Sequence, residues 1–330
     1  MLHRYMKTTI LVLAVTFFLC CYTIGCTGQE NSSQPNSSSP GGHTFTITVS
    51  GVQRSYVVHV PASYDEKTGL PVVIMFHGGG GTARAAMGKT GWGEKAEQEG
   101  FLAVFPEGTR ADLFRPADFS VNPQSWNDGS ERINVGAVRR KATDVDFVRE
   151  MIDELHLRFE VDEHRIYATG FSNGASMTFL VGRELSRSIA AIAPVAGSDW
   201  SEQATIARPI PMLYITGTAD PLNPIDGGEI RIGSKEFGEK PPVREMIQNW
   251  VQLLACPSDS HVVYDKDGVK GIAYGPCKNG SEVILYTVDQ MGHAWPGGKN
   301  LLPESLVGKG SDSIKATDVI WEFFQRHPMN

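Results

Sequence analysis

Residues 164–174 read HRIYATGFSNG, and they contain the strongest indication of the fold. A short apolar run ends at Thr169, the motif Gly170-Phe171-Ser172-Asn173-Gly174 follows it, and a helix-compatible segment spans 175–185. Strand, sharp turn and helix are the context in which a serine between two glycines is lifted above a sheet. The glycines leave room for the turn, and the helix N-terminus favours developing negative charge. We therefore predict that Ser172 is a nucleophile at the end of a buried strand.

Apolar runs and helical stretches alternate along the rest of the chain. Two segments with strand-like alternation, 44–49 and 56–60, come first. Continuous apolar runs typical of buried parallel strands follow at 71–76, 102–105, 166–169, 189–195, 211–215 and 283–288. The clearest helix spans about 144–158, where Thr143 and Asp146 resemble a capping box, and another spans about 313–326. The pattern predicts an α/β fold with a mostly parallel central sheet and helices on both faces.

A serine nucleophile needs a base that a third group orients. Three histidines follow Ser172 in the chain, namely His261, His293 and His327. His293 comes directly after the run 283–288, on a loop beyond a strand end, whereas His327 lies at the end of the terminal helix. We predict that His293 is the base.

The orienting acid is expected at the carboxyl end of a neighbouring strand. Asp220 follows the run 211–215 closely, in the segment Thr216-Gly217-Thr218-Ala219-Asp220-Pro221. Asp226, on the same loop, and Asp289, four residues before His293, remain alternatives. We predict Asp220.

Acyl transfer also needs N–H donors for the oxyanion. The strand 72–76 ends in His77-Gly78-Gly79-Gly80-Gly81, and glycines let a backbone approach a substrate closely. We predict that the N–H groups of Gly79 and Asn173 are the donors, with Gly78 or Gly80 as alternatives to Gly79.

Four motifs together resemble one group of α/β-hydrolases, the polyhydroxybutyrate depolymerase/feruloyl esterase group, which overlaps carbohydrate esterase family one. These motifs are His77-Gly78-Gly79-Gly80-Gly81, Gly170-Phe171-Ser172-Asn173-Gly174, Gly217-Thr218-Ala219-Asp220-Pro221 and Gly292-His293-Ala294-Trp295-Pro296-Gly297-Gly298. The resemblance covers nearly all of 43–328 and implies the α/β-hydrolase fold with Ser172, Asp220 and His293 as a catalytic triad. The loop departs from the group at Gly79, where a bulkier residue is expected.

The resemblance implies a serine carboxylic-ester hydrolase that forms an acyl-enzyme. No metal or cofactor is expected, because the sequence contains no HExxH, no CxxC and no phosphate loop. The expected substrates are small-molecule or oligosaccharide esters, such as feruloyl or acetyl esters of plant polysaccharide fragments, with hydroxyalkanoate oligomers as the alternative. A serine peptidase, an acyltransferase and a non-catalytic surface binding protein are the other functions that the sequence leaves open.

Specificity is expected to come from loops. Residues 107–141 form a long segment with few structural signals, and such segments are often functional. We predict that Trp126 and Trp295 form an aromatic wall for the substrate, with Trp200 as a third candidate. The alternative is that these are tryptophans of the core.

The N-terminal region is typical of an exported protein. Residues 1–25 read as a signal segment, with Arg4 and Lys7 before an apolar run. Thr23-Ile24-Gly25-Cys26 resembles a bacterial lipobox, although leucine is usual where Thr23 stands. We predict a lipid-anchored protein of the cell envelope with Cys26 lipidated; a simply cleaved secretory signal and an uncleaved anchor are the alternatives.

Residues 26–42 are rich in Ser, Asn, Pro and Gly, which predicts a flexible tether, and 43–330 are expected to form one catalytic domain. Cys256 and Cys277 are an even pair in an exported protein, so we predict a disulfide between them, with two buried thiols as the alternative.

The composition limits the classes of function. Hydrophobic residues make up 41% of the chain and aromatic residues 9%, which is enough for a sizeable core. The net charge of −7 provides no basic footprint for nucleic acid.

Overall fold

A computed structural model describes residues 39–201, 205–232, 235–300 and 302–329. The predicted signal segment, Cys26 and the tether up to residue 38 lie outside the described residues.

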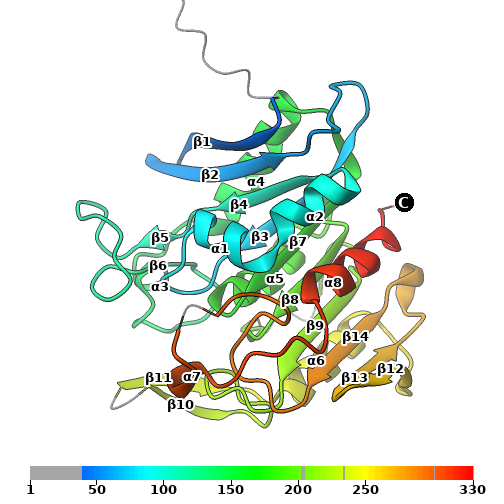
Figure 1. Cartoon of the computed structure of the whole chain (residues 1–330). Helices are drawn as coiled ribbons and strands as arrows, with labels where there is room; N and C mark the ends of the chain where they lie inside the picture. The colour runs from blue at the N-terminus through cyan, green and yellow to red at the C-terminus, as the bar shows by residue number, and fades with distance from the viewer. Residues whose placement is uncertain (1–38, 202–204, 233–234, 301, 330) are drawn as a thin grey trace, which may run out of the picture. The chain divides into compact units, whose positions relative to one another are not determined.

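A ten-stranded sheet forms the centre of the fold (Figure 1). In sheet order its strands are β1 (Gly41–Val49), β2 (Val52–Val60), β4 (Leu102–Pro106), β3 (Leu70–Phe76), β7 (Val161–Phe171), β8 (Ala191–Val195), β9 (Met212–Gly217), β14 (Val283–Val288), β13 (Val269–Tyr274) and β12 (His261–Lys266). The strands from β4 to β14 in this order run parallel, and antiparallel strands flank them on both sides. The prediction of a mostly parallel sheet in an α/β-hydrolase fold is confirmed.

Helices and short strands make up the remaining regular structure. The helices are α1 (Ala83–Thr90), α2 (Trp92–Glu99), α3 (Gly136–Arg139), α4 (Asp144–Arg158), α5 (Asn173–Glu184), α6 (Val243–Leu253), α7 (Glu304–Val307) and α8 (Ala316–Gln325), with a 3₁₀ turn at Lys278–Gly280. The short strands pair as β5 (Thr109–Arg110) with β6 (Gln124–Ser125), and as β10 (Gly228–Ile232) with β11 (Lys235–Lys240). Within the described ranges, no helix is long and apolar enough to cross a membrane.

Both faces of the sheet are covered, which explains the continuous apolar runs in the sequence. On β3, Ile74 and Phe76 pack with residues of α4, α5 and α6, while Val73 and Met75 pack on the other face with residues of α1, α2 and α8. A parallel strand buried on both sides needs apolar residues at successive positions, so it does not show alternation.

The first strand does show alternation, whereas β2, for which alternation over 56–60 was also predicted, is buried at four of these five positions. Residues of β1 alternate between exposed and partly buried, as predicted for 44–49, and the strand lies at the edge of the sheet. This strand begins at Gly41, two residues before the predicted domain boundary.

One local prediction needs correction, and one hairpin was not predicted. The helix predicted at 144–158 is present as α4, but the Thr143 side chain makes no capping bond. Its neighbour Asp144 instead turns inward to an ion pair with Arg54. The hairpin of β12 and β13 was not predicted; its strands are short, and the β12 side chains, Val262 and Val263 included, are exposed almost throughout.

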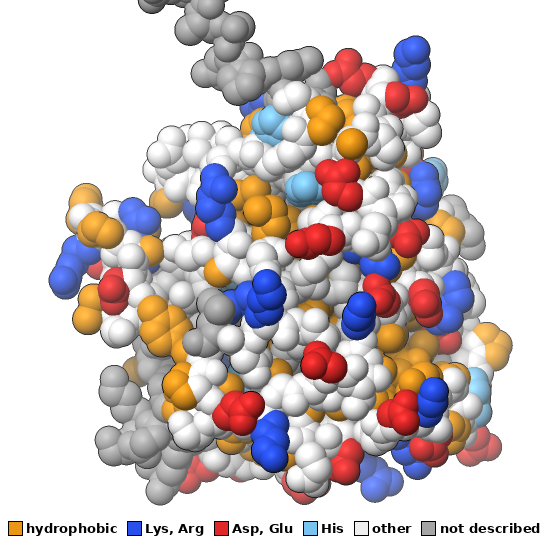
Figure 2. Space-filling view, viewed as in Figure 1, with side chains coloured by type: hydrophobic (Ala, Val, Ile, Leu, Met, Phe, Trp, Pro, Cys, Tyr) orange, Lys and Arg blue, Asp and Glu red, His pale blue; other side chains and the backbone are white. Residues whose placement is uncertain are grey.

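A loop between β5 and β6 projects from the domain at the left of Figure 1. Figure 2 shows apolar side chains gathered on it, and Phe114, Phe119 and Val121 are its exposed large apolar residues. The Asn122 side chain secures the loop by donating to the carbonyls of Asp112, Arg115 and Pro116.

Candidate active site

Ser172 stands at the sharp turn between β7 and α5. Its backbone has φ 57° and ψ −120°, a conformation that L residues rarely adopt. A Cβ at Gly170 would lie 2.3 Å from the carbonyl oxygen of Gly174, and one at Gly174 would lie 2.2 Å from that of Phe76. The turn therefore requires glycine at both positions.

The side chains of Ser172, His293 and Asp220 form one hydrogen-bonded chain. The Ser172 hydroxyl lies 2.8 Å from His293 Nε2, and His293 Nδ1 lies 2.8 Å from Asp220 Oδ2. Because a carboxylate can only accept, Nδ1 carries the proton and Nε2 is left to accept from the serine. This geometry is that of a serine–histidine–aspartate relay; the catalytic role of each residue stays a prediction.

The alternative residues lie apart from this chain. Asp226 is exposed, and Asp289 is also exposed and accepts a hydrogen bond from the Thr218 hydroxyl. His261 is an exposed residue of β12, and His327 pairs with Glu282.

Asp220 is buried, and its carboxylate accepts three hydrogen bonds. Burial acts to raise the pKa of this carboxyl, but the charge and hydrogen bond of His293 and the N–H groups of Leu222 and Asn223 together hold it below its ordinary value. The two N–H groups donate to Oδ1 at 2.8 Å each, leaving Oδ2 for His293. The carboxylate is therefore ionised and fixed in orientation.

A buried lysine lies behind the acid. Lys240, at the end of β11, is 8% exposed and donates from Nζ to Asn223 Oδ1 at 2.9 Å. Burial first, and then the charge of Arg132, lower the pKa of Lys240 to about 7. Asn223 donates in turn to the Tyr214 hydroxyl. Neither Lys240 nor Asn223 was predicted, since only the folded chain brings β11 to this loop.

The glycine loop after β3 lies over the turn at Ser172. A Cβ at Gly78 would lie 3.4 Å from that of Ser172, and one at Gly79 would lie 3.9 Å from that of Asn173. The N–H of Gly80 donates to the Gln124 carbonyl at 2.7 Å, which removes Gly80 from the candidate oxyanion donors. Within the described part of the chain, the N–H groups of Gly79 and Asn173 have no backbone acceptor.

His77 fixes the direction of that loop. Its Nε2 accepts from the Gly108 N–H, so Nδ1 carries the proton and donates to the Gly78 carbonyl at 2.8 Å. In a planar trans peptide the N–H of Gly79 points opposite to this carbonyl. Holding the Gly78 carbonyl therefore also holds the direction of the Gly79 N–H.

Trp126 supports the same loop from below, and the prediction that it forms a substrate wall is wrong. Its side chain is 0% exposed, and its indole N–H donates to the His77 carbonyl at 2.8 Å. Its backbone N–H and carbonyl bond the side-chain amide of Asn173, which also donates to Asp128 at 2.7 Å. The alternative, that Trp126 is a tryptophan of the core, is what the structure shows.

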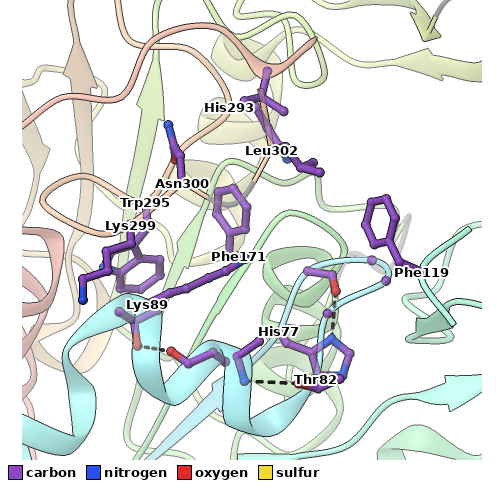
Figure 3. Close-up of a pocket in the computed structure, with 18 of the residues that line it drawn as sticks. His77, Thr82, Lys89, Phe119, Phe171, His293, Trp295, Lys299, Asn300 and Leu302 are labelled. Carbon is purple, nitrogen blue, oxygen red and sulfur yellow. Dashed lines mark hydrogen bonds between the residues drawn. The ribbon is translucent and has the colours of Figure 1, made fainter. Parts of the chain in front are cut away.

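A cavity of about 440 Å³ opens beside His293 and Phe171 (Figure 3). Its large apolar lining residues are Met75, Phe119, Phe171, Trp295, Leu302 and Val307. Trp295 thus lies in the cavity wall, with its N–H bonded to the Thr317 hydroxyl. Trp200 is partly buried under the guanidinium of Arg132, 4.7 Å from the ring centre, and is not among the lining residues.

The comparison with known protein families agrees with the geometry of the candidate site. The sequence pattern of the dienelactone hydrolase family matches residues 58–233, more than half of the chain. The chain belongs to the dienelactone hydrolase family. It is a serine-type carboxylic-ester hydrolase, and the resemblance to polyhydroxybutyrate depolymerases and feruloyl esterases is confirmed.

The relatives of this dienelactone hydrolase family member described next have low sequence identity to it. Feruloyl esterase B of Piromyces equi is 28% identical over 74% of this chain and 44% of its own length. The chain therefore spans less than half of that relative. Feruloyl esterase D of Neurospora crassa is 25% identical over 86% of each protein. The acetyl xylan esterase from Aspergillus awamori has the same fold, with a TM-score of 0.56 and 15% identity over 86% of this chain and 99% of that one.

Several residues of the hydrolase site gave little signal in the sequence. Phe119 stands in an irregular segment and reaches the cavity only because its loop folds back over Gly80. Phe171, whose ring lies 4.8 Å from that of His293, is next to the predicted nucleophile, and this position is the one signal that could have found it. Lys89 lies on α1, which the sequence did not predict.

Proposed function

We propose that this protein hydrolyses carboxylic esters with Ser172 as nucleophile, His293 as general base and acid, and Asp220 as the residue that orients His293. The observation that carries the proposal is the continuous chain of two 2.8 Å hydrogen bonds through His293.

The reaction has two steps. Ser172 Oγ attacks the ester carbonyl carbon while His293 Nε2 takes the hydroxyl proton. The N–H groups of Gly79 and Asn173 hold the resulting oxyanion, and each such donor contributes about 3 kcal/mol to transition-state stabilisation. His293 then gives its proton to the leaving alcohol as the C–O bond breaks, and water attacks the acyl-enzyme in the same way to release the acid.

The proposed substrates are feruloyl or acetyl esters of plant polysaccharide fragments. The names of the relatives support this class, as do the aromatic cavity walls formed by Phe119, Phe171 and Trp295. Oligomers of hydroxyalkanoates are the second candidate, favoured by the similarity to a poly(3-hydroxyalkanoate) depolymerase.

A substrate panel tests the function. The purified protein and Ser172→Ala should be assayed on methyl ferulate, 4-nitrophenyl acetate and hydroxybutyrate oligomers, with acid release as the readout. We expect ester hydrolysis by the wild type and a loss of roughly a million-fold in Ser172→Ala. Hydrolysis of oligomers alone would move the assignment to the second candidate. Hydrolysis of none of the three, or undiminished activity of Ser172→Ala, would contradict the proposal.

The location is a further part of the proposal. We propose that residues 1–25 direct export and that lipidated Cys26 and a tether up to about residue 40 attach the catalytic domain to a membrane. Cell fractionation tests it: Cys26→Ala should move the exported protein from the membrane to the soluble fraction. A variant that stays fully membrane-bound after export would refute lipid attachment.

A further inference from the structure

The cavity beside the candidate triad combines apolar walls with positive charge. Two lysines, Lys89 and Lys299, are among its lining residues, and no aspartate or glutamate is among the described residues that line it. The chain as a whole carries a net charge of −7, so a cationic cavity runs against the charge of the protein. The positive charge of the cavity therefore points to a role in binding its ligand.

Lys89 is the more informative of the two. It lies in the last turn of α1 and is half-buried, and burial lowers its pKa. Among the ion pairs between described residues, none includes Lys89. A half-buried ammonium without a carboxylate partner has lost part of its hydration and received no counter-charge in return.

Lys299 brings a second cation to the same end of the cavity. Its backbone N–H donates to the Lys89 carbonyl at 3.2 Å, which ties the loop after Trp295 to the end of α1. In Figure 3, Lys89, Lys299 and Trp295 lie on one side of the cavity and Phe119 on the opposite side, with Phe171 between them. The two lysines thus lie on the side of the cavity away from Phe119.

Ligand cavities are mostly apolar, with a few polar groups that fix the orientation of the ligand. Here those groups are ammonium groups, which donate hydrogen bonds and carry positive charge, so the complementary group is an anion. Since His293 and the glycine loop line the same cavity, a molecule held there has one part at the lysines and another at the candidate triad.

We propose that Lys89, assisted by Lys299, forms a subsite for a free carboxylate, so that the preferred substrates are esters that carry a carboxylate apart from the ester bond. The proposal rests on the proposed function, because the ester is taken to react at Ser172. It narrows the substrate class beyond neutral feruloyl and acetyl esters.

Pairs of esters that differ only in charge test the subsite. For a carboxylate on the acyl side, the pair is monomethyl terephthalate and methyl 4-carbamoylbenzoate. For a carboxylate on the alcohol side, it is 4-acetoxybenzoate and 4-acetoxybenzamide. The readout is the ratio of kcat/KM for the anionic ester to that for its neutral amide. Comparing this ratio between variants cancels the intrinsic reactivity of each ester.

Lys89→Met removes the charge and keeps much of the side-chain length. We expect it to lower the ratio by about tenfold or more for at least one of the two pairs, as is typical for a hydrogen bond to a charged group. Lys89→Arg should retain most of the ratio, and Lys89→Glu should lower it further. Lys270→Met, an exposed lysine of β13 that does not line the cavity, is the matched control and should leave the ratio unchanged.

A measurement on the wild type avoids any folding defect in the variants. Terephthalate should inhibit hydrolysis of 4-nitrophenyl acetate more strongly than terephthalamide. Because the lysines are partly exposed, the difference in inhibition between the two compounds should become smaller as salt is added.

The outcomes separate the subsite from the underlying function. If both members of each pair are hydrolysed, but their ratio is the same in the wild type, Lys89→Met and Lys89→Glu, the carboxylate subsite is refuted and the esterase proposal stands. If no ester is hydrolysed at all, both proposals fail.

Discussion

At the residue scale, the turn at Ser172 depends on two places where no side chain fits. Gly170→Ala would put a methyl group 2.3 Å from a backbone oxygen, so the backbone itself must move. We expect this variant to lose about 3 kcal/mol or more of unfolding free energy, or to fail to fold. Urea denaturation measures the loss.

A glycine with open space around it provides the control. Gly88 lies on the exposed side of α1 and has no atom within 4 Å of a built Cβ. Gly88→Ala should therefore stabilise the protein by about 1 kcal/mol, since alanine is the better helix former. Equal effects of the two substitutions would show that steric room at Gly170 is not what the turn requires.

His77 makes the stability of the protein depend on pH. Burial, as the largest cause, lowers the pKa of His77 to about 4 from an ordinary value of 6.5. Between these values the unfolded chain binds a proton that the native state does not. Stability is therefore fully present above pH 6.5 and falls by about 3 kcal/mol as the pH drops toward 4.

Denaturation at pH 7 and pH 4 checks this for the wild type and for His77→Gln, which cannot titrate. The wild type should lose about 3 kcal/mol more than the variant over this range. The same pH dependence in both proteins would show that His77 is protonated in the native state.

At the scale of elements, the parallel strands and the turn at Ser172 could be predicted because their signals are local. The run at 211–215 is apolar since both faces of β9 are buried, and Gly170 and Gly174 are adjacent to the nucleophile they accommodate. The supports of the site could not be predicted in this way. Trp126 under the glycine loop and Lys240 behind Asp220 reach their partners only across the fold, and nothing in the neighbouring sequence marks them.

The position of Trp126 changes what its substitution should do. A wall residue would affect KM for aromatic esters, whereas a buried support of the His77 carbonyl should affect kcat. We expect Trp126→Phe, which keeps a ring but loses the hydrogen bond, to lower kcat by about tenfold on methyl ferulate and 4-nitrophenyl acetate alike. A rise in KM confined to the ferulate would contradict the supporting role.

The disulfide between Cys256 and Cys277 joins the segment after α6 to the turn between β13 and β14. With a sequence separation of 21 residues, it is expected to stabilise the fold by about 3 kcal/mol. A double Cys256→Ala and Cys277→Ala variant should lose this amount in urea denaturation and keep its kcat, because the bond lies outside the candidate site. Unchanged stability would show that the cross-link is dispensable.

At the scale of the whole molecule, the candidate triad forms because three segments that are far apart in the sequence end at the same edge of the sheet. Ser172 follows β7, Asp220 follows β9 and His293 follows β14, and the carboxyl ends of these parallel strands meet at the same edge. The sheet topology thus brings the nucleophile, the base and the acid together, although they are far apart in the chain.

Labelling with a fluorophosphonate, followed by mass spectrometry of the digested protein, is the most direct test of Ser172 as an activated nucleophile. Our account predicts one phosphonyl adduct, on the peptide that contains Ser172, and its near-complete loss in His293→Ala when that variant is folded. Ester hydrolysis by a wild-type protein that takes up no label at Ser172, or equal labelling of His293→Ala, would contradict it.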